Sequence, residues 1–200
     1  MMSALTILRS LAAIDSLLCY DAGYYFLKDR CRIPVTHVFG APAEGEMPAQ
    51  WGAALVEVYR AFDGCELFVP PAENWSPLLR LFSLAELPAA KALLLAELAE
   101  TAEIIGGYAE PIRLAADVQA CCVIGQLGGG DYILLRDTGR VCVLELEAIA
   151  DSRLVLDELE EEWPDFDALI GSLAANLIAY LGSSWRHQNP SGRQFVAEAV

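Results

Sequence analysis

Hydrophobic and polar residues form their clearest pattern between Cys121 and Glu147, where three apolar runs are separated by two turn signals. The first signal spans residues 128–131 and the second spans residues 137–139. Both suit tight hairpins, because glycine adopts positive φ without a steric clash and aspartate hydrogen-bonds the turn backbone. The pattern predicts a three-stranded antiparallel meander with one face buried. The residues with structural roles in its turns are Gly128, Gly129, Gly130, Asp131, Asp137 and Gly139.

Apolar residues recur at helical spacing in four other segments, which are residues 3–18, 49–62, 88–105 and 166–181. This spacing predicts amphipathic helices that lie on a core. In the first segment the apolar stripe includes Leu17 and Leu18. In the third segment the carboxylates, Glu97 among them, are predicted to face water. The leucines of that segment that are predicted to face the core are Leu93, Leu94, Leu95 and Leu98.

The order of these elements predicts the fold class. Helices come first, residues 113–119 lead into the meander, and a helix closes the chain, which is typical of α+β proteins. We expect an antiparallel meander sheet with N-terminal helices, a central long helix and a C-terminal helix packed on it. Residues 33–39 predict a short strand at a sheet edge, because Pro34 cannot donate to a ladder. The 200 residues, 55% of them hydrophobic, suffice for one domain over residues 1–182, followed by a tail over residues 183–200.

The net charge argues against nucleic acid as a partner and favours a basic protein. The chain has 28 acidic and 13 basic residues and a formal net charge of −15. Nucleic acid requires a basic surface, whereas an acidic surface attracts basic proteins. The same acidity also keeps an apolar-rich chain soluble without any partner, and this alternative stays open. The candidate partner-binding residues are an acidic run and one aromatic side chain: Glu158, Glu160, Glu161, Glu162 and Trp75.

Hydropathy indicates a chain without membrane contact. No uninterrupted apolar stretch has the length needed to cross a bilayer, and the most apolar segment, residues 89–102, contains Lys91, Glu97 and Glu100. The apolar N-terminal stretch lacks the basic cluster of a secretory signal and is interrupted by Asp15. We therefore expect a cytoplasmic protein.

Side chains suited to catalysis or metal binding are few. The six cysteines lack CxxC spacing and are expected to be free buried thiols, and His37 and His187 lie in no zinc-binding motif. The glycine turn precedes a strand, whereas a phosphate loop precedes a lysine or a helix, so we interpret Asp131 as a turn former. We predict no metal, no cofactor and no catalytic residues. The alternative is a hydrolase without a recognisable motif that uses Asp131, His37 or Cys122.

Three segments in a fixed order carry a resemblance to a known family. The first is Met47-Pro48 with Trp51 and residues 54–64, which looks like an opening of Leu-Pro, an aromatic residue, a helix and Asn-Gly. The second is residues 81–87, and the third is residues 123–141, with Gly-Gly-Asp, a strand and Asp-x-x-Gly-x-Val. A final helix opens near Phe166. This order resembles the SUKH superfamily, which includes the yeast Smi/Knr cell-wall regulators and many bacterial immunity proteins of polymorphic toxin systems.

The resemblance covers residues 48–181 and has departures. Met47 replaces the family's leucine, Asp63 replaces its asparagine, and the helix over residues 88–105 is longer than expected. Residues 1–45 fall outside it and are candidates for a lineage-specific segment.

The resemblance implies a function and an assembly. It implies a non-catalytic immunity-type protein that captures and neutralises a cognate toxin, with the acidic charge suited to a basic, nuclease-like one. The first alternative is a housekeeping regulator or scaffold of the Smi/Knr type, and the hydrolase comes last. We expect a monomer or weak homodimer, and in the family the glycine-turn motif is structural.

Overall fold

A computed structural model describes residues 2–13, 17–20, 32–69, 76–104, 109–128, 130–144, 162–181 and 186–187. In chain order the described elements are α1 (Ala4–Ala12), β1 (Leu17–Tyr20), β2 (Arg32–Phe39), α2 (Ala53–Ala61), β3 (Cys65–Val69), β4 (Leu79–Leu81), α3 (Leu87–Ile104), α4 (Ala109–Ala120), β5 (Cys122–Leu127), β6 (Asp131–Leu135), β7 (Val141–Leu144), β8 (Glu162–Trp163), α6 (Phe166–Leu181) and β9 (Arg186–His187).

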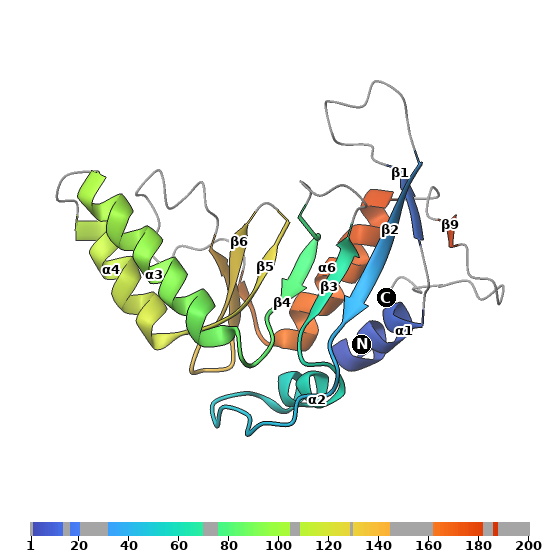
Figure 1. Ribbon diagram of the computed structural model, residues 1–200, viewed down its shortest axis with the longest axis horizontal. Coiled ribbons are helices and arrows are strands. Elements are labelled where there is room, and N and C mark those ends of the chain that lie inside the picture. The colour runs from blue at the N-terminus through green and yellow to red at the C-terminus, as the bar shows by residue number, and fades with distance from the viewer. Residues whose placement is uncertain are drawn as a thin grey trace.

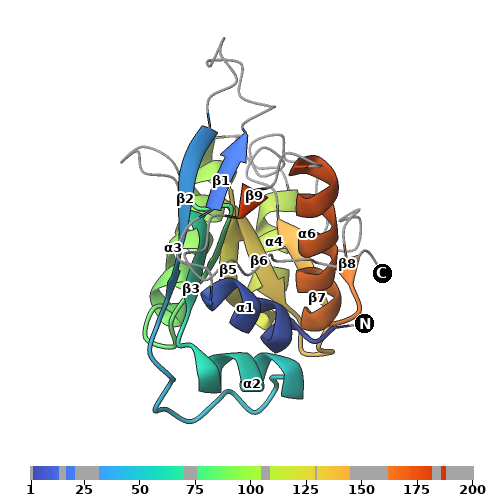
Figure 2. The ribbon, with the colours of Figure 1, turned by 90° about the vertical axis from the view of Figure 1, so that its right-hand side faces the viewer.

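One sheet organises these elements. Its strand order is β8-β7-β6-β5-β4-β3-β2-β1-β9, and every pairing in it is antiparallel. Helices α1 and α6 contact each other and lie together on one face of the sheet, and α2 contacts both of them (Figures 1 and 2). Helices α3 and α4 pack side by side and contact β5 (Figure 1). The predicted α+β class is confirmed.

The predicted meander is confirmed as β5, β6 and β7. The two turns contain glycines with positive φ, 108° at Gly130 and 83° at Gly139, where a side chain would be strained. The N–H of Gly130 donates to the carbonyl of Leu127, and that of Gly139 donates to Arg136. Asp131 begins β6 opposite Leu127. Gly128 lies in the first turn, Asp137 lies in the second, and Gly129 is outside the described residues.

The meander is the centre of the hydrophobic core. Every side chain from Tyr132 to Leu135 and from Val141 to Leu144 is buried. Neighbouring residues of a strand point to opposite faces, so these stretches of β6 and β7 are covered on both faces, whereas the sequence pattern predicts one buried face. Buried side chains of α1 and α6 belong to the same core: Ile7, Leu8, Leu11, Phe166, Leu169 and Ile170. Helix α6 begins as predicted after Asp165, whose Oδ1 accepts the N–H of Ala168 at 2.8 Å.

The first predicted helix is too long. Helix α1 ends at Ala12, and Leu17 and Leu18 lie in β1, opposite Val35 and Pro34 of β2. The helical spacing of the leucines continues by coincidence into a segment whose conformation depends on a strand distant in sequence. Tertiary pairing therefore overrides the local pattern.

The prediction that residues 33–39 form an edge strand is also wrong. Strand β2 lies between β1 and β3 in the sheet. Its first half, residues 32–35, pairs with β1, and the described pairs of its second half, from Thr36 to Phe39, are with β3. Pro34 belongs to the half that pairs with β1. Its missing N–H therefore does not interrupt the hydrogen bonds between β2 and β3.

The helical region before the meander differs from the prediction in three respects. Residues 109–120 form α4, and strands β1 to β4 lie among the helices that precede the meander, so the predicted block of helices before any strand is wrong. In α3, Leu94 and Leu98 are buried as predicted, but Leu93 is 55% exposed. Glu97 accepts a hydrogen bond from the Tyr132 hydroxyl at 3.0 Å and does not simply face water. Helix α3 is apolar around much of its circumference, so periodicity alone could not assign its buried face.

We expect the contact between β4 and β5 to tolerate no side chain at Gly125. A Cβ there would overlap the carbonyl oxygen of Arg80, so Gly125→Ala must push two paired strands apart. The loss in free energy of unfolding, measured in urea, should be at least about 2 kcal/mol. The control is Gly171→Ala in α6, where a Cβ meets no atom within 4 Å and helix propensity predicts a gain of about 0.5–1 kcal/mol. Equal effects of the two substitutions would contradict this account.

Candidate functional site

The residues predicted to bind a partner lie mostly outside the described part of the chain. This applies to Trp75, Glu158, Glu160 and Glu161. Glu162 begins β8, a two-residue strand at one end of the sheet, where its backbone pairs with Cys142 of β7. A role of the acidic run in binding therefore stays a prediction.

The three candidate residues of the hydrolase alternative are not brought together. Cys122 and Asp131 lie at opposite ends of the β5–β6 hairpin, five residues apart along the strand, or roughly 15 Å. His37 lies in β2, three strands from β5, or about 14 Å across the sheet. Catalysis requires a base within hydrogen-bonding distance of the nucleophile, directly or through one water. These side chains do not form a catalytic site with one another.

His37 has a structural environment. Its Nδ1 accepts the N–H of Phe68 at 3.0 Å, and the two rings meet edge to face with centroids 4.6 Å apart. Phe68 has a φ of 55°, which is uncommon for a residue with a side chain, and the β2–β3 register shifts between Thr36 and Val38. Burial lowers the pKa of His37 to about 4, so the ring is neutral near pH 7. The histidine therefore fixes an irregular point in the sheet.

Four of the six cysteines are shown to be free, as predicted. Cys65, Cys121 and Cys142 are buried, and Cys122 is half-buried. Burial raises the pKa of the Cys121 thiol to about 11 and also raises that of Cys122, so neither is a ready nucleophile. In the described part of the chain, no group of three His, Cys, Asp or Glu side chains could hold a metal ion. No described helix has the length and apolar character needed to span a bilayer.

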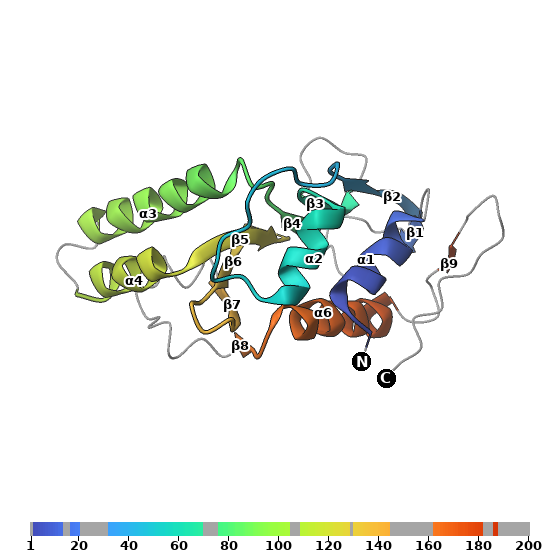
Figure 3. The same ribbon diagram turned by 90° about the horizontal axis from the view of Figure 1, so that it is seen from below.

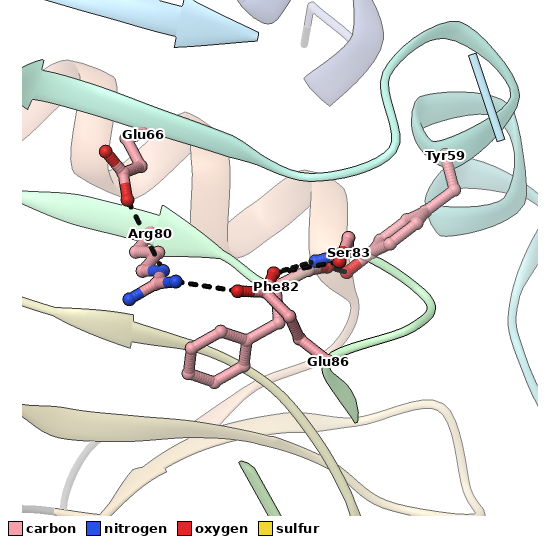
Figure 4. A network of polar contacts seen from close by, with 6 residues as sticks. All are labelled: Tyr59, Glu66, Arg80, Phe82, Ser83 and Glu86. Atoms are coloured by element: carbon pink, nitrogen blue, oxygen red, sulfur yellow. Dashed lines mark hydrogen bonds and ion pairs between the residues drawn. The ribbon is translucent and has the colours of Figure 1, made fainter. Parts of the chain in front are cut away.

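A polar network joins β3, β4 and the start of α3 (Figure 4). Arg80 bonds Glu86 at 2.7 Å and lies 3.4 Å from Glu66, and its guanidinium is 5.3 Å from the centre of the Phe82 ring. Glu86 also accepts the N–H and the hydroxyl of Ser83, at 2.8 and 2.9 Å. The hydrogen bond from the Ser83 N–H is the main reason that the pKa of Glu86 is lowered. Because Arg80 is already held by two carboxylates, we interpret this network as structural.

The backbone of Phe82 lies beside this network and joins the sheet to α2. Its N–H donates to the carbonyl of Ile124 in β5 at 3.0 Å, and its carbonyl accepts the hydroxyl of Tyr59 at 2.6 Å (Figure 4). Tyr59 is fully buried, and burial raises the pKa of its phenol, so the hydroxyl keeps its proton. We call these two hydrogen bonds the Phe82 junction.

The same end of α2 holds the loop that precedes it. The N–H of Ala43 donates to the carbonyl of Tyr59 at 3.0 Å, and the N–H of Asp63 donates to Ala41 at 2.7 Å. At the other end of the loop, the Trp51 ring packs on the Tyr59 ring, with centroids 4.6 Å apart. Residues 43–51 thus arch beside α2 between two fixed points (Figure 3).

A concave surface lies between this arch and α2, and we call it the α2 groove. Its volume is about 640 Å³, and it is shallow and largely open to solvent. Apolar residues that line it include Met47, Pro48 and Trp51, which precede α2, and Val56 of α2. Charged residues that also line it are Glu44 and Glu46 of the loop and Arg60 of α2, and all three are exposed.

The lining of the α2 groove has the composition of a binding surface. It contains no histidine, cysteine, serine or threonine, and its carboxylates, Glu44 and Glu46, are both exposed. In the described part of the chain, no ion pair involves Glu44, Glu46 or Arg60. Apolar side chains bordered by exposed polar groups are typical of protein-binding surfaces, which have an apolar centre and a polar rim.

Local sequence patterns contain only a weak signal for the α2 groove. Glycine and proline indicate a loop over residues 40–48, and two glutamates in it precede the apolar Met47-Pro48. The approach of this loop to α2 depends on Tyr59, Phe82 and residues 63–64, which local patterns do not connect.

Comparisons of the chain with known protein families, curated proteins and solved structures found no match.

We expect Tyr59→Phe to weaken the Phe82 junction. The substitution leaves the buried Phe82 carbonyl without its donor and should lower the free energy of unfolding by about 1–2 kcal/mol. Tyr132→Phe is the matched control. It removes the hydroxyl that donates to Glu97, but that carboxylate is half-exposed and can accept a hydrogen bond from water instead. Urea unfolding of both variants measures the difference. A loss for Tyr59→Phe that does not exceed the control's would contradict the structural role of the junction.

We also expect His37 to make stability depend on pH. Its pKa of about 4 in the folded chain is below its ordinary value of 6.5, so the unfolded chain binds more protons between these values. The contribution of His37 to the free energy of unfolding is fully present above pH 6.5. It falls by up to about 3 kcal/mol as the pH drops toward 4.

His37→Asn tests this dependence. The asparagine side-chain oxygen can accept the Phe68 N–H but does not titrate, so urea unfolding at pH 7.5 and 4.5 should show a smaller difference for the variant. Parallel pH profiles of the two chains would exclude His37 as the cause.

Proposed function

We propose that this chain is a non-catalytic protein-binding module that captures a basic protein partner. The observation that carries the proposal is the α2 groove, a concave surface lined by apolar and charged side chains, with two carboxylates that form no ion pair with a described residue. It is supported by the net charge of −15, which attracts cationic proteins at long range.

The partner that we propose is a toxin. The order of motifs over residues 48–181 resembles the SUKH superfamily, and its immunity proteins bind and neutralise toxins of the same system. A nuclease-like toxin has a basic surface because it binds phosphates, and that surface would complement this chain. A partner of this kind makes the chain an immunity-type protein that works in the cytoplasm as a monomer or weak homodimer.

The test begins with a tagged chain purified from its host in 50 mM NaCl, with bound proteins identified by mass spectrometry. The expected partner is basic, and its gene neighbours that of this chain. Its measured affinity should fall by about tenfold or more between 50 and 500 mM NaCl, because salt screens exposed charges. An affinity that is indifferent to salt would contradict the electrostatic part of the proposal.

A titration of toxin activity separates capture from catalysis. A binding module inhibits in proportion to its amount, with an end point near one chain per toxin, whereas an enzyme that inactivates the toxin acts at far lower ratios. A basic cellular partner without a linked toxin, together with a deletion phenotype, would instead favour a regulator of the Smi/Knr type.

The acidic run gives a further comparison within the same experiment. Combined Glu-to-Gln changes at residues 158, 160, 161 and 162 should weaken binding if this run contacts the partner. The comparison is made per charge removed with a control that carries Glu-to-Gln changes at exposed Glu57 and Glu100, which lie on α2 and α3 outside the α2 groove.

A further inference from the structure

We propose that the α2 groove binds an extended protein segment in which a large apolar residue is flanked, on the side of Glu44 and Glu46, by lysine or arginine. This inference deepens the proposed function, on which it rests, by naming the site and the chemistry of the segment that the site accepts.

The apolar lining determines the central residue of the segment. Met47 and Val56 are half-buried and partly packed against the core, so each keeps part of its side chain accessible within the groove. Pro48 adds a rigid apolar surface beside them. An aliphatic or aromatic side chain that enters the groove would remove this surface from water, which is the main favourable term in such contacts.

The charges determine what flanks that residue. Glu44 and Glu46 are exposed, and neither forms an ion pair with a described residue. A lysine or arginine of the segment would supply the missing positive charge. Arg60 lies one helical turn beyond Val56 on the same face of α2 and would repel a segment that is cationic along its whole length. The groove therefore favours basic residues at one end of the segment only.

The arch is formed before any partner arrives. The hydrogen bonds of Ala43 and Asp63 hold one end, and the packing of Trp51 on Tyr59 holds the other. Gly45 lies in the middle of the arch. A Cβ added to it would lie 3.4 Å from a methyl carbon of Leu84, so this part of the loop lies close to Leu84. Binding to a loop fixed in this way requires little ordering, which favours affinity for a short segment.

Short synthetic peptides test the proposal with the intact chain. The probe is an acetylated and amidated Gly-Lys-Arg-Leu-Ser-Gly peptide, titrated into ¹⁵N-labelled chain in 50 mM NaCl. We expect chemical-shift changes concentrated in residues 43–60. Replacing the leucine of the probe with glycine should weaken binding by about fivefold or more, because the apolar contact is lost. Replacing the lysine and arginine with glutamates should abolish measurable binding.

Two double variants of the chain separate the groove from the general acidity. Glu44→Gln with Glu46→Gln should weaken binding of the probe by about threefold or more, as expected for two exposed charge pairs. Glu57→Gln with Glu100→Gln changes the net charge equally, lies outside the groove, and should leave the affinity nearly unchanged. Equal effects of the two pairs, or shifts outside residues 43–60, would overturn the proposal, as would a probe whose leucine has no effect.

The same variants distinguish failure of this inference from failure of the proposed function. If the host partner binds the Glu44/Glu46 variant as tightly as the unmodified chain, the groove is not the binding site, but the capture of a basic partner stands. If the unmodified chain captures no basic partner, the proposed function fails whatever the peptides show.

Discussion

The structure depends most on the main chain at Phe82, where three parts of the molecule meet. Its N–H bonds β5, its carbonyl accepts the Tyr59 hydroxyl of α2, and the next residue, Ser83, donates to the Glu86 carboxylate just before α3. Both of the Phe82 bonds involve buried groups, so neither can be exchanged for water without cost. The positions of α2 and α3 relative to the sheet are thus determined at adjacent peptide groups.

This junction also explains why a stable groove exists at the end of α2. Tyr59 donates its hydroxyl to Phe82, accepts the N–H of Ala43 at its own carbonyl, and packs against Trp51. One residue therefore connects the sheet to both ends of the arch. A surface loop that lacked such contacts would change conformation readily, and its glutamates would have no defined position relative to Val56 and Arg60. The binding proposal relies on that defined position.

Local chemistry determined which parts of the fold the sequence could predict. The meander turns were predictable because Gly130 and Gly139 adopt positive φ, and α6 was predictable because Asp165 caps it. The errors share another cause. The conformation of Leu17 and Leu18 depends on β2, and the interior position of β2 depends on β1 and β3. The α2 groove was missed for the same reason, since the residues that shape it are joined by contacts between Tyr59, Phe82 and Ala43 and not by any motif.

We propose that a preformed external surface beside α2, and no reactive pocket, is the working part of this chain. Hydrogen–deuterium exchange with and without the basic protein that co-purifies with the chain tests it most directly. The account predicts added protection of the backbone amides of residues 44–50 on binding, with the slow exchange of Phe82 unchanged because the junction is formed in both states. Protection confined to other surfaces, with residues 44–50 exchanging as fast as in the free chain, would contradict it.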